Sequence, residues 1–309
     1  MTMNRRQILQ FGSAALPALH ALTARAQAPA PAPAPGTAPI PAPRIVASFS
    51  ILADMAQELA PTGAQVTSLV GPDADAHVYE PSPADGRRLA RADLVLINGL
   101  GFEGWIERMV KVSGYRGTVA VASSGLQPRT GGHHNVDPHA WQDLALARRY
   151  AVNISAAFAE RWPRQREEIA RRNADYTARI DSLDRQVRDW LGAVPRAQRR
   201  VITSHDAFGY FGAAYGVDFL APQGWNTHSE PSAAAVARLI RQIKKDGVRA
   251  IFIENISDRR LVERIADEGG ARIGGTLYSD ALSKPGGPAA TYLRLMEHNA
   301  RILAAALQG

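Results

Sequence analysis

The chain has 309 residues, of which 46% are hydrophobic, and a formal net charge of +7. This length accommodates two domains of ordinary size, and the apolar fraction suffices for a core in each. Because there is no cysteine, we expect no disulfide, thiolate metal ligand, catalytic thiol or cysteine-linked lipid; and because Lys and Arg are scattered among acidic residues, we expect no nucleic-acid binding.

Residues 1–28 are typical of a twin-arginine export signal. The motif Asn4-Arg5-Arg6-Gln7-Ile8-Leu9 precedes a short apolar stretch from Phe11 to Leu22, and small-residue patterns predict cleavage after Ala26 or Ala28. These roughly twelve apolar residues are too few to span a bilayer, which takes about 20. Residues 29–43 are rich in Pro and Ala, a composition that favours polyproline II and predicts an extended tether.

From residue 44 onward, strand and helix patterns alternate, which predicts an α/β protein with mainly parallel sheets. We expect strands near 44–50, 65–70, 93–98, 118–122, 200–204, 217–220, 249–254 and 271–277. We expect helices near 51–60, 83–92, 104–112, 142–160, 163–191, 206–215, 231–246, 258–268 and 288–307.

One predicted helix is longer than either half of the chain is expected to be wide. Apolar residues recur along it at steps of three and four, which indicates one buried stripe (Tyr176, Ile180, Leu183, Val187, Trp190). About thirty helical residues span roughly 45 Å. We therefore predict a rigid linking helix at 161–193 between an N-terminal α/β lobe, 44–160, and a C-terminal α/β lobe, 194–309.

Four short motifs carry side chains that can bind a transition metal. They are Asp75-Ala76-His77-Val78-Tyr79-Glu80-Pro81, Asp137-Pro138-His139-Ala140-Trp141, His205-Asp206-Ala207-Phe208-Gly209-Tyr210-Phe211 and Leu277-Tyr278-Ser279-Asp280. Three imidazoles and a carboxylate suit a divalent ion. Ligands of open parallel sheets bind outside the carboxyl ends of the strands, so His77 and His139 from one lobe can meet His205 and Asp280 from the other. Asp280 has the alternative role of a helix cap.

Other polar residues near these motifs have two possible roles. Four aspartates can accept the second ring N–H of a ligating histidine or can cap a following helix (Asp73, Asp75, Asp143, Asp206). His133 and His134 are expected on a solvated loop, with weak metal capture as the alternative. We expect His20, His228 and His298 to be structural or surface residues.

The four motifs make the chain resemble the zinc- and manganese-binding solute-binding proteins of bacterial ABC importers, over residues 44 to 309. The resemblance implies two α/β lobes joined by one long helix and a metal site formed by His77, His139, His205 and Asp280. It also implies delivery of the ion to a membrane permease from the periplasm. The chain departs from many zinc-specific members because Gly131-Gly132-His133-His134-Asn135 stands where they have a long His-rich insertion, and from others because it lacks their disulfide.

We expect zinc as the bound ion, with manganese as the alternative, because imidazole suits zinc whereas manganese prefers oxygen ligands. A zinc hydrolase is the rival interpretation, but a fourth protein ligand closes the position that catalytic water needs; the sequence also lacks an H-E-x-x-H helix and a G-x-S-x-G elbow. A fold that depends on structural zinc is a third interpretation. We expect a monomer that is not an enzyme, whose ligands are exposed loop residues.

Overall fold

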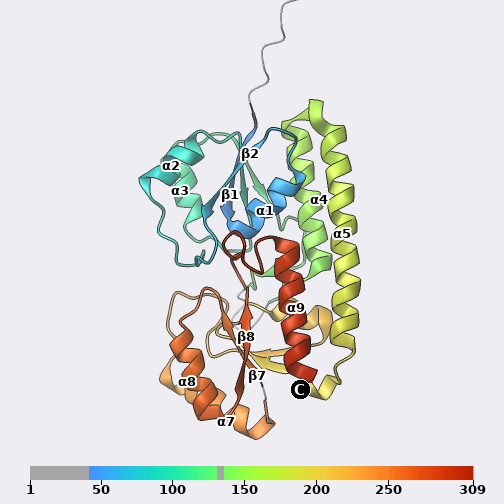
Figure 1. Ribbon diagram of the computed structural model, residues 1–309. Coiled ribbons are helices and arrows are strands. Elements are labelled where there is room, and N and C mark those ends of the chain that lie inside the picture. The colour runs from blue at the N-terminus through green and yellow to red at the C-terminus, as the bar shows by residue number, and fades with distance from the viewer. Residues whose placement is uncertain (1–41, 131–135, 249, 309) are drawn as a thin grey trace, which may run out of the picture. The chain divides into compact units, whose positions relative to one another are not determined.

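The computed structural model describes residues 42–130, 136–248 and 250–308 (Figure 1). The predicted export signal at 1–28 and nearly all of the predicted tether at 29–43 lie outside these ranges. The described residues from Ala42 onward form a single compact unit. Among the described helices, none combines the length and apolar character needed to cross a membrane.

The first half of this unit is built on a parallel four-stranded sheet. Its strands are β1 (Arg44–Phe49), β2 (Gln65–Val70), β3 (Leu94–Ile97) and β4 (Thr118–Val121), in the order β2-β1-β3-β4. The connecting helices are α1 (Ser50–Leu59), α2 (Pro83–Ala90) and α3 (Ile106–Ser113). The central strand β1 is buried from Ile45 to Phe49, as expected for a strand covered on both faces. Helix α2 begins with a capping box, because the Ser82 side chain accepts the amide of Asp85 while the Asp85 side chain accepts that of Ser82.

The second half repeats this architecture. Its strands are β5 (Arg200–Ile202), β6 (Asp218–Leu220), β7 (Ala250–Glu254) and β8 (Arg272–Leu277), all parallel and in the order β6-β5-β7-β8. The helices are α6 (Gly209–Tyr215), α7 (Ala233–Asp246) and α8 (Arg259–Gly269). Every strand and helix predicted in the described part of the chain is present, with boundaries shifted by a few residues. The predicted fold class is confirmed.

Three long helices run beside the sheets: α4 (Leu144–Arg161), α5 (Arg166–Gly192) and α9 (Tyr292–Gln308). A 3₁₀ turn, Pro163–Gln165, precedes α5, so the α-helix begins three residues later than predicted. Four of the five predicted stripe residues on α5 are buried, and Trp190 is half-buried under the guanidinium of Arg301. Helix α5 contacts α1 and α4 of the first half and α6 and α9 near the second (Figure 1). With 27 residues it spans about 40 Å.

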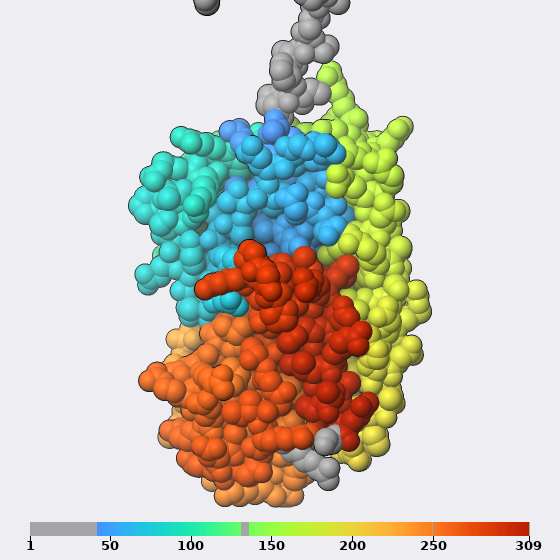
Figure 2. All heavy atoms as spheres, viewed as in Figure 1, coloured from blue at the N-terminus to red at the C-terminus, as the bar shows by residue number. Residues whose placement is uncertain are grey.

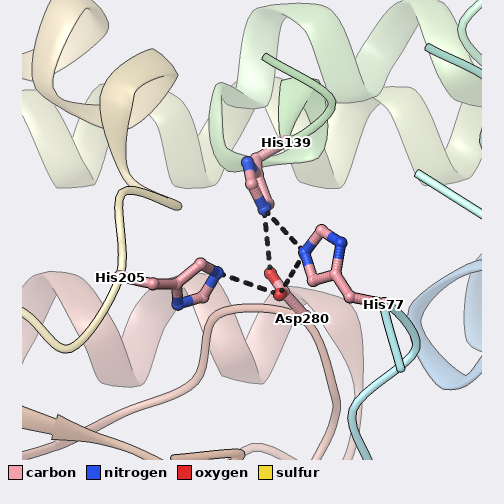
Figure 3. A group of neighbouring side chains, drawn as sticks. All are labelled: His77, His139, His205 and Asp280. Carbon is pink, nitrogen blue, oxygen red and sulfur yellow. Dashed lines mark hydrogen bonds and ion pairs between the residues drawn. The ribbon is translucent and has the colours of Figure 1, made fainter. Parts of the chain in front are cut away.

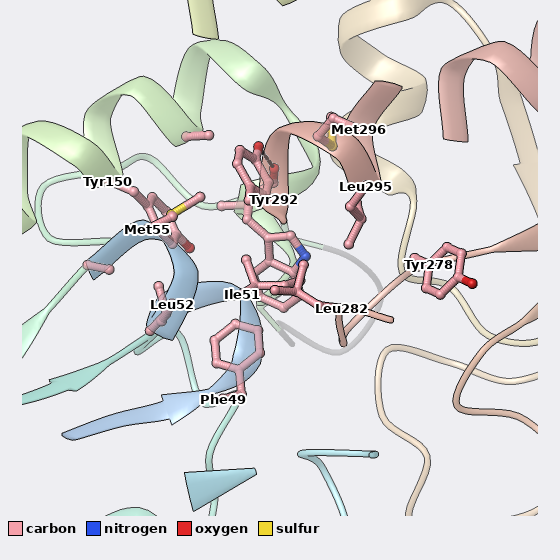
Figure 4. Packing of buried hydrophobic residues seen from close by; sticks show 14 of the residues in the cluster. Phe49, Ile51, Leu52, Met55, Tyr150, Tyr278, Leu282, Tyr292, Leu295 and Met296 are labelled. Atoms are coloured by element: carbon pink, nitrogen blue, oxygen red, sulfur yellow. Dashed lines mark hydrogen bonds between the residues drawn. The ribbon is translucent and has the colours of Figure 1, made fainter. Parts of the chain in front are cut away.

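The two halves share one hydrophobic core. Phe49, Ile51 and Leu52 of the first half belong to the same buried cluster as Tyr292 and Leu295 of α9 (Figure 4). Figure 2 shows the C-terminal segment, in red, lying against both halves of the unit. A second, smaller cluster fills the space between the second sheet and helices α7 and α8. The lobe boundaries at 160/161 and 193/194 remain predictions.

Candidate metal centre

The structure brings His77, His139, His205 and Asp280 together (Figure 3). Each residue follows a different strand: β2, β4, β5 and β8 respectively. One ligand atom from each lies within 4.8 Å of the others. Nε2 of His77 and Nε2 of His205 are each 3.2 Å from Oδ2 of Asp280, and Nε2 of His139 is 3.6 Å from Oδ1. The carboxyl ends of two sheets therefore meet at one set of donor atoms, as we predicted from the binding of ligands outside the carboxyl ends of parallel strands.

Several of these separations are close to those expected around a tetrahedral ion. If each ligand atom is about 2.1 Å from zinc, tetrahedral angles place the ligand atoms about 3.4 Å from one another. The distance between Nε2 of His77 and Nε2 of His139 is 3.3 Å, close to that value. The donor set of three nitrogens and one carboxylate also suits a divalent transition ion. The geometry thus accommodates a metal ion with little rearrangement.

Backbone and side-chain hydrogen bonds hold each ligand segment in place. The amide of His77 donates to Asp75 Oδ1 at 2.8 Å, and Trp105 Nε1 donates to the carbonyl of the preceding Ala76 at 2.8 Å. The carbonyl of Pro138, before His139, accepts from Asn98 at 3.0 Å.

On the side of Asp280, the indole of Trp141 and the amide of Gln142 both donate to the carbonyl of Ser279, at 3.0 and 2.7 Å. The segment that follows His139 therefore fixes the segment that carries Asp280.

The four candidate ligands are buried, so the prediction that they are exposed loop residues is wrong. His139, His205 and Asp280 are 0% exposed and His77 is 4% exposed. The loops lose their exposure because loops from both sheets pack against one another and against aromatic rings. The ring centroid of Phe102 is 4.6 Å from that of His77.

Burial also leaves the Asp280 carboxylate with few partners. Within the described residues, its recorded neighbours are the imidazole nitrogens of the site, at 3.2 to 3.6 Å. Unpaired polar atoms in a protein interior are costly. A cation at the point where these atoms converge would satisfy them together.

Charge and burial act in opposite directions on the titration of the site. Burial would raise the pKa of Asp280, but the imidazoles of His139 and His205 hold this pKa well below its usual range. Burial would lower the pKa of His205, but the carboxylates of Glu254 and Asp280 raise it well above its ordinary value. Burial lowers the pKa of His77, against the opposing effect of Asp280. The metal-free site therefore favours a proton on His205 and a charged carboxylate on Asp280.

Two buried carboxylates behind the ligands were missed by the sequence analysis. Oδ1 of Asp137 is 2.8 Å from Nδ1 of His139 and also accepts the amide of that residue at 3.0 Å. Oε2 of Glu254 is 2.6 Å from Nδ1 of His205, and its Oε1 accepts the amide of His205 at 2.8 Å. A carboxylate at Nδ1 orients the ring and directs Nε2 toward the metal. Asp137 stands in the quoted motif two residues before His139, whereas Glu254 is distant in sequence and ends an apolar strand.

The four aspartates proposed for this role have other contacts. Asp75 accepts the hydroxyl of Thr227 as well as the amide of His77, and Asp73 accepts the side-chain amide of Asn255 at 3.1 Å. Asp143 caps α4 by accepting the amide of Ala145, which is its alternative role. Among the described residues, none of the four, Asp206 included, hydrogen bonds to a ligand ring nitrogen.

The remaining histidines lie away from this centre or outside the described ranges. Nε2 of His298 is 3.0 Å from the carbonyl of Thr276, a structural contact, and His228 is exposed. His20, His133 and His134 lie outside the described residues.

Two parallel four-stranded sheets, a long helix that contacts elements of both halves and a buried group of three histidines and one aspartate fit the class of metal-binding solute-binding proteins. Residues 45–306 match the family model described as "ZnuA: Zinc-uptake complex component A periplasmic". The chain belongs to this family, which confirms the resemblance to solute-binding proteins of ABC importers.

Individual relatives cover most of the chain. It is 33% identical to the zinc-binding protein TroA of Treponema pallidum over 86% of this chain and 89% of TroA. It is 31% identical to the manganese-binding lipoprotein MntA of Bacillus subtilis over 86% of this chain and 90% of that protein. The solved structure of periplasmic zinc-binding TroA superposes with a TM-score of 0.83 and 31% identity, covering 86% of this chain and 99% of that one.

Proposed function

We propose that this protein captures zinc outside the cytoplasm and delivers it to the membrane permease of an ABC importer. The observation that carries the proposal is the convergence of His77, His139, His205 and Asp280, whose ligand atoms lie within 4.8 Å of one another in a buried site. The family to which the chain belongs supports the transport role. The zinc-binding relative TroA supports the ion.

Zinc is favoured over manganese by the donor atoms. Three imidazole nitrogens and one carboxylate suit zinc, whereas manganese prefers more oxygen ligands. The 3.2 to 3.6 Å separations between neighbouring ligand atoms are also compatible with the tetrahedral geometry that zinc adopts in closed sites. Manganese is the alternative, because a relative of similar identity is a manganese-binding protein and because Asp280 has two oxygens, both of which can bind a larger ion.

A binding protein is favoured over a zinc hydrolase by the same donor set. A fourth protein ligand occupies the position that an activated water needs. All four residues are also buried, so a substrate larger than the ion has no direct access to them. The site thus serves to hold an ion rather than to carry out chemistry with it.

Export and assembly complete the proposal. The Arg5-Arg6 motif supports transport through the twin-arginine route, with cleavage after Ala26 or Ala28, a tether to residue 43 and a mature protein that works as a monomer in the periplasm. Residues 44–160 and 194–309 would be the two metal-binding lobes and 161–193 the link. Cell fractionation with a substitution of both arginines by lysine tests the route; secretion that is unchanged by this substitution overturns it.

The decisive experiment for the ion is metal analysis of protein purified from its native compartment, together with competition titrations in vitro. We expect one zinc per chain and a zinc affinity at least about a hundredfold above that for manganese. Native protein loaded mainly with manganese would identify manganese as the bound ion. Equal affinities for both ions would overturn the predicted preference for zinc. A wild-type chain that binds neither ion overturns the function itself.

A further inference from the structure

We propose that Tyr210 is a positioning residue for metal retention, which ties the segment carrying His139 to the helix that follows His205. This inference rests on the proposed function, because it concerns the stability of the metal-bound site. Tyr210 lies on α6 of the second half and is 3% exposed. It does not belong to the four ligands or to the two carboxylates that contact them.

The hydroxyl of Tyr210 joins two separate points of the first half of the chain. It accepts the backbone amide of Arg129 at 2.8 Å and donates to the backbone carbonyl of Asp137 at 3.0 Å. The backbones of these two residues are also joined directly, because the amide of Asp137 donates to the carbonyl of Arg129 at 2.9 Å. One phenol therefore fixes both Arg129 and Asp137 to α6.

Side chains reinforce this attachment. The guanidinium of Arg129 lies over the Tyr210 ring, 5.6 Å from its centroid, and its Nε is 3.5 Å from Oδ2 of Asp137. The start of α6 packs directly on this pair, because a Cβ added to Gly209 would lie 2.9 Å from Asp137 Oδ2 and 3.1 Å from Arg129 Nε. Such distances are shorter than ordinary packing contacts, so a side chain at position 209 would displace the Asp137 or Arg129 side chain.

Asp137 transmits this attachment to the metal ligand. Its backbone is held by Tyr210, while its side chain contacts both the Nδ1 and the amide of His139. The position of the imidazole therefore depends on the position of the Asp137 backbone. Helix α6 begins four residues after His205, so Tyr210 mechanically connects a ligand from each sheet.

Loss of the hydroxyl should loosen this connection without disturbing the packing. Tyr210→Phe retains the ring and its contact with Arg129 but leaves the part-buried amide of Arg129 and the buried carbonyl of Asp137 without their shared partner. A buried hydrogen bond of this kind is worth roughly a factor of ten in an equilibrium constant. We expect about tenfold weaker zinc binding. The change should lie mainly in a faster dissociation rate, because the four ligands are unchanged and association with the ion should remain similar.

The test compares Tyr210→Phe with Tyr176→Phe, a matched control on α5. Tyr176 is also buried, and its hydroxyl has no hydrogen-bond partner among the described residues. Zinc affinity is measured by competition with a chromophoric chelator and dissociation by stopped flow, and the visible spectrum of the cobalt-substituted site reports ligand geometry. We expect weaker binding and an altered cobalt spectrum for Tyr210→Phe alone. Its metal-free melting temperature should also fall below that of Tyr176→Phe, because only Tyr210→Phe removes hydrogen bonds.

A second comparison separates positioning from general destabilisation. Asp137→Ala removes the side chain that connects the backbone of residue 137 to the His139 ring. In this background, adding Tyr210→Phe should therefore change zinc affinity less than about twofold. Equal effects of Tyr210→Phe in both backgrounds, or a Tyr210→Phe variant with wild-type affinity and cobalt spectrum, overturn the inference while leaving metal binding intact. Failure of the wild-type chain to bind any divalent ion instead overturns the proposed function.

Discussion

The carboxylate of Glu254 contacts both the ring and the backbone of His205. Its Oε2 is 2.6 Å from Nδ1 of His205, and its Oε1 accepts the backbone amide of His205 at 2.8 Å. Glu254 is the last residue of β7 and is 0% exposed. Because the neighbouring strand β5 leads into His205, the sheet itself brings the two residues together. A carboxylate at Nδ1 leaves Nε2 free to bind the ion and increases the basicity of Nε2.

Glu254→Gln should therefore weaken zinc binding by about 10- to 100-fold, the usual effect of removing a carboxylate that orients a ligand histidine. Glutamine preserves the volume, but its neutral amide orients the ring less strongly. Competition titration with a zinc chelator measures the change. Glu107→Gln on α3, at an exposed position, is the matched control, and equal affinities in the two variants would contradict the assignment.

Replacing His205 by Glu should not by itself convert the site to manganese. The new carboxylate would lie beside the buried Glu254, and two adjacent carboxylates repel unless one takes up a proton. We expect His205→Glu alone to bind both ions poorly. Combined with Glu254→Gln, it should narrow the preference for zinc over manganese. Isothermal titration of both variants with each ion measures the two affinities. Tight manganese binding by His205→Glu alone would show that Glu254 does not oppose a carboxylate at position 205.

Zinc affinity should fall as pH decreases, and the fall should begin above pH 6.5. The carboxylates of Glu254 and Asp280 raise the pKa of His205 well above its ordinary value, against the effect of burial, and a proton on this ring must leave before zinc binds. Raising the pH therefore removes the competing proton and increases the zinc affinity. Calorimetry in buffers of different ionisation enthalpy measures the protons released. An affinity that is constant from pH 7 to pH 5 would exclude a three-histidine site.

Alanine at His77, His139 or His205 should weaken zinc binding by at least about a hundredfold, since four ligands together contribute roughly 10–16 kcal/mol in zinc sites. Because the ligands are buried, these variants should also change the stability of the metal-free protein, contrary to what exposed loops would imply. For His205→Ala, Glu254 loses its facing imidazole and metal-free stability should decrease. Chelator competition and thermal melting measure the two effects separately, with His228→Ala as the exposed control.

Removal of zinc should lower the melting temperature without unfolding the protein. The shared core is built from apolar residues of both halves, so the fold does not depend on the ion. Saturating zinc at about 1,000 times Kd adds only about 4 kcal/mol. Scanning calorimetry with and without chelator measures this increment, and the absence of any cooperative transition after chelation would indicate a zinc-dependent fold.

Local sequence patterns were sufficient to predict the secondary structure and the ligand candidates. The apolar run at β3 and the stripe on α5 each arise from neighbours in the chain, so periodicity reveals them. His77, His139 and His205 stand in distinctive motifs, and each motif follows a predicted strand. Since parallel strands place their carboxyl ends on one edge of a sheet, the convergence of the ligands was predictable as well.

Tertiary structure alone decided how the ligands are held. Glu254 reaches His205 across 49 positions of the chain, and Tyr210 contacts Asp137 across 73; nothing in the local sequence of either residue identifies its partner. The burial of the ligands was equally hidden, because a loop that follows a strand is normally solvated. Here loops from two sheets cover each other, so residues that local sequence places at the surface become buried.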